Sequence, residues 1–316
     1  MPSELASKLL TSLDKLAGGI HPGHRPVHAR GTMLAGTFTP NPAAADLTSA
    51  PHAVCSSTPV IVRFSIASGI PTAAQNDPAI ASPQGLAVRF QLGEHEHTDI
   101  IAHSVNGFPA RSGDEFLAFL QAVMASGPGA PTPPPIVEFL ATHPAARQYV
   151  EAPKPIPASY AQQAYFAVTA FKFTNSEGGS RFGRFRVIPG AGTSYLTPEE
   201  AASKTPDFLD TELSERLARG PVLFHIRLQL AEDGDDPTVS TVWPDTRSEV
   251  DFGTLTLTEP VDQLAQEYRK IIFDPVPRVA GIDSAGDPLT DIRSELYLMS
   301  GRRRRQAAAE QGSAAS

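Results

Sequence analysis

The chain combines short apolar segments with long proline-rich connections, and its first apolar segment has a helical period. Residues 3–17 repeat leucine at intervals of three and four behind a serine, and a pair of glycines ends the pattern. The leucines are Leu5, Leu9, Leu13 and Leu16, the serine is Ser3, and the pair is Gly18-Gly19. This spacing predicts a capped amphipathic helix, so residues 1–19 are expected to form an N-terminal helical arm.

The middle of the chain has the pattern of β-structure. Apolar runs rich in Val, Ile and Phe are bounded by turn residues, and such runs predict strands. The expected strands are Pro59–Ile66, Gly85–Leu92, Thr98–Ala102, Ala164–Phe173, Phe182–Ile188, Val222–Leu230 and Gly253–Thr258. They do not alternate regularly with helices, which favours an antiparallel sheet that closes into a barrel over a parallel sheet.

Three more segments have a helical pattern and are expected to pack outside the barrel, which makes the fold class α+β. They are Asp114–Ala125, Thr197–Arg219, with Pro198 in the first turn, and Asp262–Ile272. Ser126–Pro135 contains Gly-Pro-Gly and three consecutive prolines. It is predicted to be a loop rather than a domain boundary, since strands continue beyond it.

The amino-acid composition predicts irregular connections between these elements and a C-terminal tail. Proline accounts for 30 of the 316 residues, roughly twice its ~5% average usage, which predicts long irregular connections. From Gln306 onward the chain is mainly Ala, Ser, Gly and Glu. Such a segment has little to bury, so residues 306–316 are predicted to be a disordered tail and residues 1–305 a single domain.

Charge and cysteine content narrow the classes of function. The net charge of −8 and the pI of about 5.6 argue against a nucleic-acid-binding or membrane-surface protein. The single cysteine, Cys55, excludes an internal disulfide and fits a reducing compartment. Glu4, Lys8 and Asp14 interrupt the apolar pattern that a signal peptide requires, and no apolar run approaches the length of a membrane span. A cytoplasmic protein is expected.

The last helical segment places two chemically complementary side chains together. Asp287-Pro288 supplies an N-cap and a first-turn proline, and Arg293 and Tyr297 follow on one face of the helix, four residues apart. A guanidinium beside the phenol favours the phenolate, which is the form that binds iron. The alternative from spacing alone is a half-buried tyrosine over an exposed arginine.

A second candidate site lies near the N-terminus. The segment Arg25–Gly31 has His28 in a proline-flanked stretch with an arginine on either side. A lone histidine is more often structural than catalytic. Two other segments make a site around His28 a more specific hypothesis. Val62–Ser65 is a predicted strand with an inward-pointing Arg63 and a serine hydroxyl, and residues 99–116 form a segment rich in polar and aromatic residues.

Other motifs carry less weight. His95-Glu96-His97 has metal-binding residue types, but the side chain of Glu96 would point to the opposite face of a strand from its two neighbours, and no third ligand is evident. The sequence has no glycine-rich phosphate motif after a strand and no serine in a nucleophile elbow. Nucleotide chemistry is therefore not indicated.

In their order along the chain, several of these segments resemble motifs of the haem catalase family, and specifically its small bacterial members, the catalase-related peroxidases. Arg25–Gly31 is similar to the motif of the distal histidine. The resemblance implies that His28 is the catalytic distal base and that Arg25 meets a haem propionate. Val62–Ser65 is similar to the next motif, which implies Arg63 as a second propionate partner and Ser65 as the hydroxyl that orients His28.

The resemblance continues to the end of the last helix and spans roughly residues 20–305. Ser82–Phe90 looks like a barrel strand of the family, Thr241–Pro244 like its tryptophan-proline turn, and 273–284 like its approach to the proximal helix. Arg293–Tyr297 matches the proximal motif. Tyr297 would then be the axial ligand of the haem iron, Arg293 its charge partner and Arg304 a further propionate partner. On its own, the run Arg302–Arg305 is equally typical of a solvated basic tail or an anion-binding patch.

One segment departs from the family pattern. An ungapped match over 99–116 places Phe108 and Phe116 where the family has haem-pocket phenylalanines. It places His103 where full catalases have a distal asparagine, and Asn106 lies nearby but out of register. Both His103 and Asn106 are kept as candidates for that catalytic role. Because the asparagine helps to position a second hydrogen peroxide, its replacement disfavours efficient disproportionation.

The resemblance implies a haem b enzyme with a catalase-type barrel and a proximal haem-ligand helix. The expected activity is reduction of organic hydroperoxides, and more weakly of hydrogen peroxide, through a ferryl intermediate, with a small organic electron donor. A homo-oligomer, at least a dimer, is expected, with no nucleic-acid or membrane partner. A true catalase, a hydroperoxide isomerase and a non-catalytic haem-binding protein remain alternatives.

Overall fold

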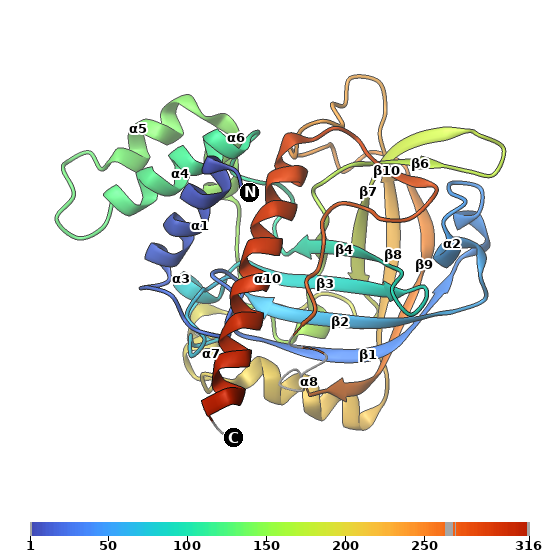
Figure 1. The fold of residues 1–316 in the computed structure, drawn as a ribbon, viewed down its shortest axis with the longest axis horizontal. Helices are drawn as coiled ribbons and strands as arrows, with labels where there is room; N and C mark the ends of the chain where they lie inside the picture. Colours follow the sequence, from blue (N-terminus) through green and yellow to red (C-terminus); the bar gives the residue numbers. More distant parts are fainter. Residues whose placement is uncertain (1, 263–267, 269, 315–316) are drawn as a thin grey trace.

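The computed structural model describes residues 2–262, 268 and 270–314, and its centre is one antiparallel sheet (Figure 1). The strands follow the order β10-β6-β7-β5-β4-β3-β2-β1-β9-β8, and β7 also pairs with β8, so eight of the strands form a closed ring. The strands are β1 (Gly31–Pro40), β2 (Thr58–Ile66), β3 (Gln84–Gln91), β4 (His97–His103), β5 (Tyr165–Phe166), β6 (Phe171–Thr174), β7 (Ser180–Pro189), β8 (Val222–Leu230), β9 (Glu249–Val261) and β10 (Ile282–Ser284). The predicted α+β class with a closed antiparallel barrel is confirmed.

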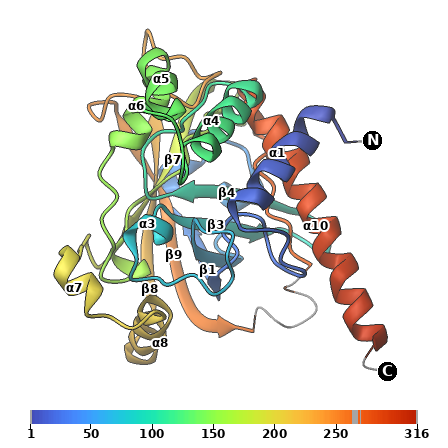
Figure 2. The same ribbon diagram turned by 90° about the vertical axis from the view of Figure 1, so that its left-hand side faces the viewer.

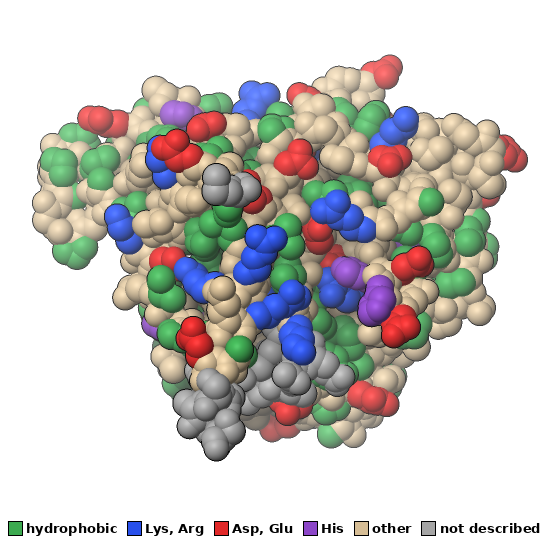
Figure 3. Space-filling view, viewed as in Figure 1, with side chains coloured by type: hydrophobic (Ala, Val, Ile, Leu, Met, Phe, Trp, Pro, Cys, Tyr) green, Lys and Arg blue, Asp and Glu red, His purple; other side chains and the backbone are tan. Residues whose placement is uncertain are grey.

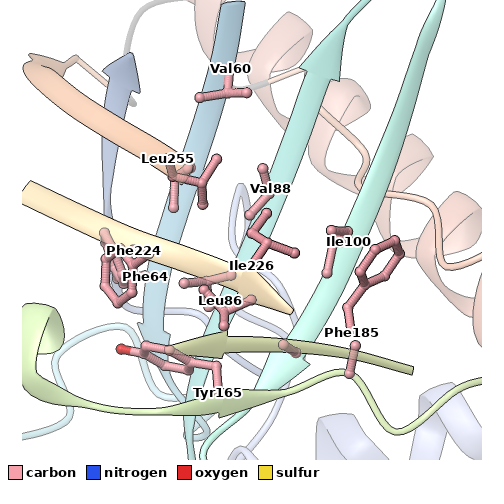
Figure 4. Packing of buried hydrophobic residues seen from close by; sticks show 14 of the residues in the cluster. Val60, Phe64, Leu86, Val88, Ile100, Tyr165, Phe185, Phe224, Ile226 and Leu255 are labelled. Carbon is pink, nitrogen blue, oxygen red and sulfur yellow. The ribbon is translucent and has the colours of Figure 1, made fainter. Parts of the chain in front are cut away.

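Alternation along the strands fills the barrel with apolar side chains. On β3, Leu86, Val88 and Phe90 are at most 1% exposed and belong to the main core. Figure 4 shows Leu86 and Val88 pointing toward Ile226 of β8 and Leu255 of β9 across the interior. The barrel is therefore a packed core, and a ligand site has to lie outside it.

The opposite faces of the same strands form the wall of such a site. On β2, Phe64 points into the barrel among Tyr160, Tyr165 and Phe224 (Figure 4). Arg63 is its chain neighbour and therefore lies on the opposite face of β2, away from the barrel core, where it lines a cavity. Arg63 is still only 4% exposed, because the helices outside the barrel cover this face.

The helices lie outside the barrel, and several of them gather at one side (Figures 1 and 2). In chain order the α-helices are α1 (Glu4–Leu16), α2 (Pro51–Val54), α3 (Pro78–Ala81), α4 (Gly113–Ala125), α5 (Pro135–Thr142), α6 (Pro144–Glu151), α7 (Pro198–Ala202), α8 (Phe208–Arg219) and α10 (Pro288–Ala314), and the short 3₁₀ helices are Pro42–Ala44 and Tyr160–Gln162. Helix α1 packs against α4 and α10 through a second apolar cluster that includes Leu9, Phe119 and Leu296.

The first and last helices, α1 and α10, are joined by side-chain contacts at this side. Both Nη atoms of Arg303 on α10 donate to the carboxylate of Asp14 on α1, at 2.6 and 2.8 Å. The backbone N–H and the hydroxyl of Ser3 both bond the carboxylate of Glu295. The expected capped helix at the N-terminus is confirmed, with Ser3 as its N-cap, although Leu16 is 43% exposed and Leu10 takes its place in the buried stripe.

Several elements differ from the sequence-based expectation. Strand β1 was missed, because Gly31 and Gly36 interrupt its apolar alternation. Gly36 is needed where β1 meets β9, since an added Cβ would lie 2.1 Å from the carbonyl oxygen of Thr256. The expected strand Ala164–Phe173 is two strands, β5 inside the ring and β6 beyond it.

The expected helices also need correction. Thr197–Arg219 is two helices, because Pro206 lies between them and cannot donate to a continuous helix. Helices α5 and α6, which follow the proline loop, were missed. The expected helix Asp262–Ile272 falls mostly on residues 263–267 and 269, which lie outside the described residues. The prediction of a disordered tail is wrong for 306–314, where α10 continues, because the Ala, Gln and Glu that dominate this segment are good helix formers. No helix of the described residues is both long enough and apolar enough to cross a membrane.

Candidate active site

A cavity lies between the outer face of the barrel and the helices at its side. It holds about 1150 Å³ of space, counting the solvent at its open mouth. Its walls come from α1, the segment after α1, strands β2 to β4, α4 and α10. The lining residues with candidate roles are Arg25, His28, Arg63, Ser65, His103, Phe108, Phe116, Arg293, Tyr297 and Arg304. Of the expected site residues, only Asn106 is not in this set.

His28 is held rigidly at the cavity wall. Its backbone has a φ of 57°, a left-handed conformation that is uncommon for a residue with a side chain. Its N–H donates to the carbonyl of Ala67 at 3.2 Å, and its own carbonyl accepts from Nη2 of Arg63 at 2.9 Å. The imidazole Nδ1 lies 3.0 Å from Oγ of Ser65. These contacts fix the ring and leave Nε2 as the ring nitrogen that Ser65 does not hold.

The imidazole of His28 also depends on a glycine in the neighbouring strand. A Cβ at Gly85 of β3 would lie 2.8 Å from Cε1 and Nδ1 of His28 and 2.8 Å from Oγ of Ser65. The imidazole therefore packs directly against the backbone of Gly85, where a side chain would not fit. The sequence predicts Gly85 only as part of a barrel strand, because it does not show which residue lies under the imidazole.

The surroundings keep His28 neutral. Desolvation, then the positive charge of Arg63, and smaller effects of His103, Arg25 and Arg293 lower the pKa of His28 to about 3. At neutral pH the imidazole is thus the free base, which can take a proton. A neutral imidazole in a desolvated cavity is the protonation state that a general base requires.

His103 and Asn106, the two candidates for the role of the distal asparagine, face different cavities. His103 ends β4 and faces the cavity, and its Nδ1 accepts a hydrogen bond from the N–H of Val105 at 3.3 Å. Desolvation, followed by the charge of Arg293, lowers the pKa of His103 to about 4. The neutral ring therefore carries its proton on Nε2. Asn106 lines a separate, neighbouring cavity.

Helix α10 supplies Tyr297 and Arg293 to the cavity from the side away from the barrel. The guanidinium carbon of Arg293 lies 6.0 Å from the ring centroid of Tyr297, and its Nη1 donates to Oγ1 of Thr169 at 3.1 Å. The two side chains lie together on one helix face, as the spacing predicts, but the guanidinium lies over the ring of Tyr297 and its hydrogen bond goes to Thr169. Thr169 was not foreseen, because it comes from a distant part of the chain.

Three arginines gather in the cavity without counter-ions. Arg63 and Arg304 are 4% and 7% exposed, and Arg25 is partly exposed. Within the described residues none of the three forms an ion pair. Arg63 donates to the carbonyls of His28 and Ala29, while Arg25 and Arg304 share the carbonyl of Ile271 at 3.4 and 3.1 Å.

The electrostatic cost of this cluster is visible in its pKa values. Desolvation, and the charge of Arg25 after it, lower the pKa of Arg304 to about 9, and desolvation lowers the pKa of Arg63 to about 10. The Nε of Arg63 is buried with no hydrogen-bond partner in the structure. Buried cations without partners are costly, so this part of the cavity calls for an anionic ligand. More Lys and Arg side chains gather on the outer surface along α10 (Figure 3).

The rest of the cavity is apolar and suits a large flat ring. Phe108 and Phe116 lie with their ring centroids 5.0 Å apart, and Leu10, Leu13, Ile272 and Leu296 add aliphatic surface. A carboxylate-bearing macrocycle such as haem matches both the apolar walls and the guanidiniums of Arg25, Arg63 and Arg304. The residues present therefore fit a haem, and the phenol of Tyr297 lies in the same cavity as an oxygen atom that could bind its iron.

Segment 271–274, which closes one side of the cavity, is anchored by an ion pair. Arg89 and Asp99 pair at 2.6 Å across β3 and β4, and both also bond the segment, Arg89 at the carbonyl of Ile272 and Asp99 at the N–H of Asp274. Oγ of Ser294 on α10 donates to Oδ1 of Asp274. This network links the barrel to α10 and so fixes the distance between these two walls of the cavity.

Comparison with known sequences identifies relatives over nearly the whole chain. The model of the catalase family matches residues 21–311. A catalase-related peroxidase of Mycolicibacterium paratuberculosis is 36% identical over 289 residues, which are 90% of this chain and 90% of that protein. A catalase-related peroxidase of Synechococcus elongatus is 31% identical over 289 residues, which are 89% of this chain and 84% of that protein.

Comparison with solved structures extends the likeness to the fold. A fungal catalase has a TM-score of 0.77 at 23% identity, and catalase A from Saccharomyces cerevisiae has a TM-score of 0.76 at 22% identity. Each match covers 94% of this chain, but only 62% and 64% of those larger structures. The chain thus has the fold of a catalase while spanning less than two thirds of their length.

Proposed function

We propose that this chain, which belongs to the catalase family, is a haem peroxidase that reduces organic hydroperoxides, and hydrogen peroxide more weakly, with electrons from a small organic donor. One observation carries the proposal. A neutral His28, oriented by Ser65, shares a cavity with Tyr297 and with three arginines that form no ion pair in the part of the chain that the structure describes. That combination provides a proton acceptor, an iron ligand and the partners for two propionates in one place.

The proposal assigns haem b to the cavity. Arg25, Arg63 and Arg304 would hold its carboxylates and Tyr297 its iron, and Phe108 and Phe116 would contact the macrocycle. When bound, haem supplies an iron at which the O–O bond of a peroxide is cleaved and through which electrons pass from a donor. The single haem domain would comprise residues 1–305.

His28 performs the proton chemistry. The free-base imidazole takes the proton from the inner peroxide oxygen and returns it to the outer oxygen, which leaves as water or an alcohol. Ser65 keeps the ring in the orientation for both steps. Arg63 stabilises the left-handed backbone of His28 through the carbonyl, so the same residue would bind a propionate and support the base.

His103 is assigned the second polar role in the cavity. Because Val105 occupies its Nδ1, its Nε2–H can donate to a peroxide oxygen. Asn106 faces away into the neighbouring cavity, so the asparagine amide of full catalases has no counterpart here. That difference favours reduction by an organic donor over reaction with a second hydrogen peroxide.

The cellular compartment and the oligomeric state of the enzyme are also part of the proposal. On the family resemblance the chain would act in the cytoplasm as a homo-oligomer, at least a dimer, in peroxide detoxification. Neither a nucleic acid nor a membrane is part of the assignment.

The test is turnover of the haem-loaded protein with cumene hydroperoxide and a phenolic dye, for the natural chain and for His28→Ala. Dye oxidation should fall by roughly 10²- to 10⁴-fold in the variant, as expected for loss of a general acid–base group, while haem binding persists. His24→Ala is the control, since His24 is exposed and outside the cavity. Equal activity of His28→Ala, or peroxide consumption without dye oxidation, would overturn the assignment. The second result would identify an isomerase, and no peroxide consumption would identify a non-catalytic haem protein.

A further inference from the structure

A second cavity lies directly behind the wall of the first. It holds about 570 Å³ of space, counting its open mouth, between the segment that follows β4, helix α6 and the loop before β9. Phe108 lines both cavities. The residues around the second cavity are Val105, Asn106, Gly107, Phe108, Ala145, Gln148, Tyr149, Ala152, Thr241, Val242 and Asp245.

We propose that this second cavity binds the organic electron donor as a small uncharged aromatic molecule bearing a hydroxyl or amino group. The inference rests on the proposed function and names the donor class for it. A peroxidase needs two substrates, and a peroxide must reach the cofactor while an electron donor need not touch it. A donor site that shares Phe108 with the cofactor cavity but is distinct from it would let both bind without competing.

The lining has the chemistry that such a donor requires. Phe108 and Tyr149 offer aromatic surface for its ring. Asn106, Gln148 and Thr241 offer uncharged hydrogen-bonding groups for its hydroxyl. Burial raises the pKa of Tyr149 to about 12, so this phenol stays protonated and can donate.

The charges around the cavity disfavour a phosphate-bearing donor. Among the described residues that line it, none is Lys or Arg. The one charged side chain is Asp245, and Nη2 of Arg186 pairs with its carboxylate at 3.1 Å. Phosphates are usually held by arginine forks, lysines or helix N-termini aimed at the group. An uncharged ring is therefore the better fit.

Two aromatic routes connect the cavities. Phe108 packs against Phe116 in the first cavity at 5.0 Å between ring centroids. Tyr149 lies edge-on to His103 at 6.4 Å, and His103 faces the first cavity. Each donor would lose one electron across this wall and release one proton, forming a phenoxyl or aminyl radical. Two donors then supply the two electrons and two protons with which one hydroperoxide becomes an alcohol and water.

The first experiment measures donor binding without turnover. Ferric haem broadens the proton NMR signals of guaiacol when the donor binds near the iron. We expect broadening in the natural chain and its loss in Ala145→Phe, which fills the cavity from α6, and in Gln148→Trp, a second variant at an exposed lining position. Arg147→Trp is the matched control, because Arg147 is exposed on the same helix and does not line the cavity.

The second experiment measures steady-state kinetics with guaiacol and cumene hydroperoxide. In the two cavity variants the KM for guaiacol should rise by roughly 10-fold or more, equal to the loss of one or two good contacts. The KM for the hydroperoxide and the affinity for cyanide should not change. Unchanged guaiacol broadening and KM in both variants would overturn the donor site while leaving the peroxidase assignment intact. No guaiacol oxidation by the natural chain would instead contradict the peroxidase assignment. Tighter binding of NADPH than of guaiacol would overturn the uncharged class.

Discussion

The Nδ1 atom of His28 lies 3.0 Å from Oγ of Ser65, and an added Cβ at Gly85 would lie 2.8 Å from both of these atoms. Three segments of the chain thus meet at one imidazole, and each restricts its position. The contact explains why a histidine in an irregular, left-handed segment can serve as an oriented base. It also makes separate predictions for the hydroxyl and for the glycine.

Ser65→Ala removes the hydrogen bond and leaves the imidazole to be held by packing alone. A neutral hydrogen bond contributes about 0.5–1.5 kcal/mol, so kcat/KM for cumene hydroperoxide should fall roughly 2- to 12-fold. Steady-state kinetics of the haem-loaded protein measure the loss. Ser68→Ala is the control, because that hydroxyl accepts a hydrogen bond from the N–H of Ile70 and does not contact His28. An unchanged kcat/KM in Ser65→Ala would mean that the hydroxyl does not orient His28.

Gly85→Ala should move the imidazole, since the new methyl would overlap it. Overpacking of this kind costs about 1–3 kcal/mol, so the protein should still fold while its peroxide activity falls. Thermal unfolding and kcat/KM, measured on the same preparation, separate the two effects. Gly93→Ala, in the turn between β3 and β4, has room for a Cβ and should change neither quantity. Full activity in Gly85→Ala would show that the imidazole is not fixed at this position.

The pH dependence follows from the low pKa of His28. The base works only when neutral, and its pKa of about 3 means that protonation sets in only as the pH falls toward 3. We therefore expect kcat/KM for the hydroperoxide to stay level from pH 7.5 down to about 5, with no transition near the usual histidine pKa of about 6.5. Circular dichroism at each pH verifies that the protein is folded. A loss of activity with an apparent pKa near 6.5, in protein that is still folded, would contradict the description of the cavity as desolvated.

Arg304→Met tests whether the arginine cluster exists for an anionic ligand. Without the ligand, Arg304 is a buried cation with no counter-ion among the described residues, so its removal should leave the melting temperature of the haem-free protein unchanged or higher. Haem affinity should fall about 10- to 150-fold, the effect of a charge-assisted hydrogen bond worth about 1.5–3 kcal/mol. Arg302→Met is the matched control, because Arg302 is exposed on the same helix. Destabilised haem-free protein with normal haem affinity would assign Arg304 a structural role.

Much of the barrel could be predicted from alternation, because strands such as β8 bury every second residue. Strand β1 could not, since Gly36 is explained by the close approach of β9 and Gly31 by the close approach of Phe64 and Arg63 on β2. In the candidate site, too, some residues could be predicted from the sequence and others could not. Arg293 and Tyr297 are neighbours by helical geometry, and His28 and Ser65 were paired through a resemblance. Neither source indicates Gly85, Thr169 or the second cavity, because these depend on which distant segments the fold brings together.

The central claim is tested most directly by comparing two products of the haem-loaded protein: oxidised guaiacol and released oxygen. Both are measured in the same reaction, with cumene hydroperoxide and with hydrogen peroxide. The account predicts guaiacol radicals formed at two per hydroperoxide consumed, faster with cumene hydroperoxide, and little oxygen from hydrogen peroxide. Rapid oxygen release from hydrogen peroxide with little guaiacol oxidation would contradict it. That outcome would make the chain a small catalase in which His103 supports disproportionation.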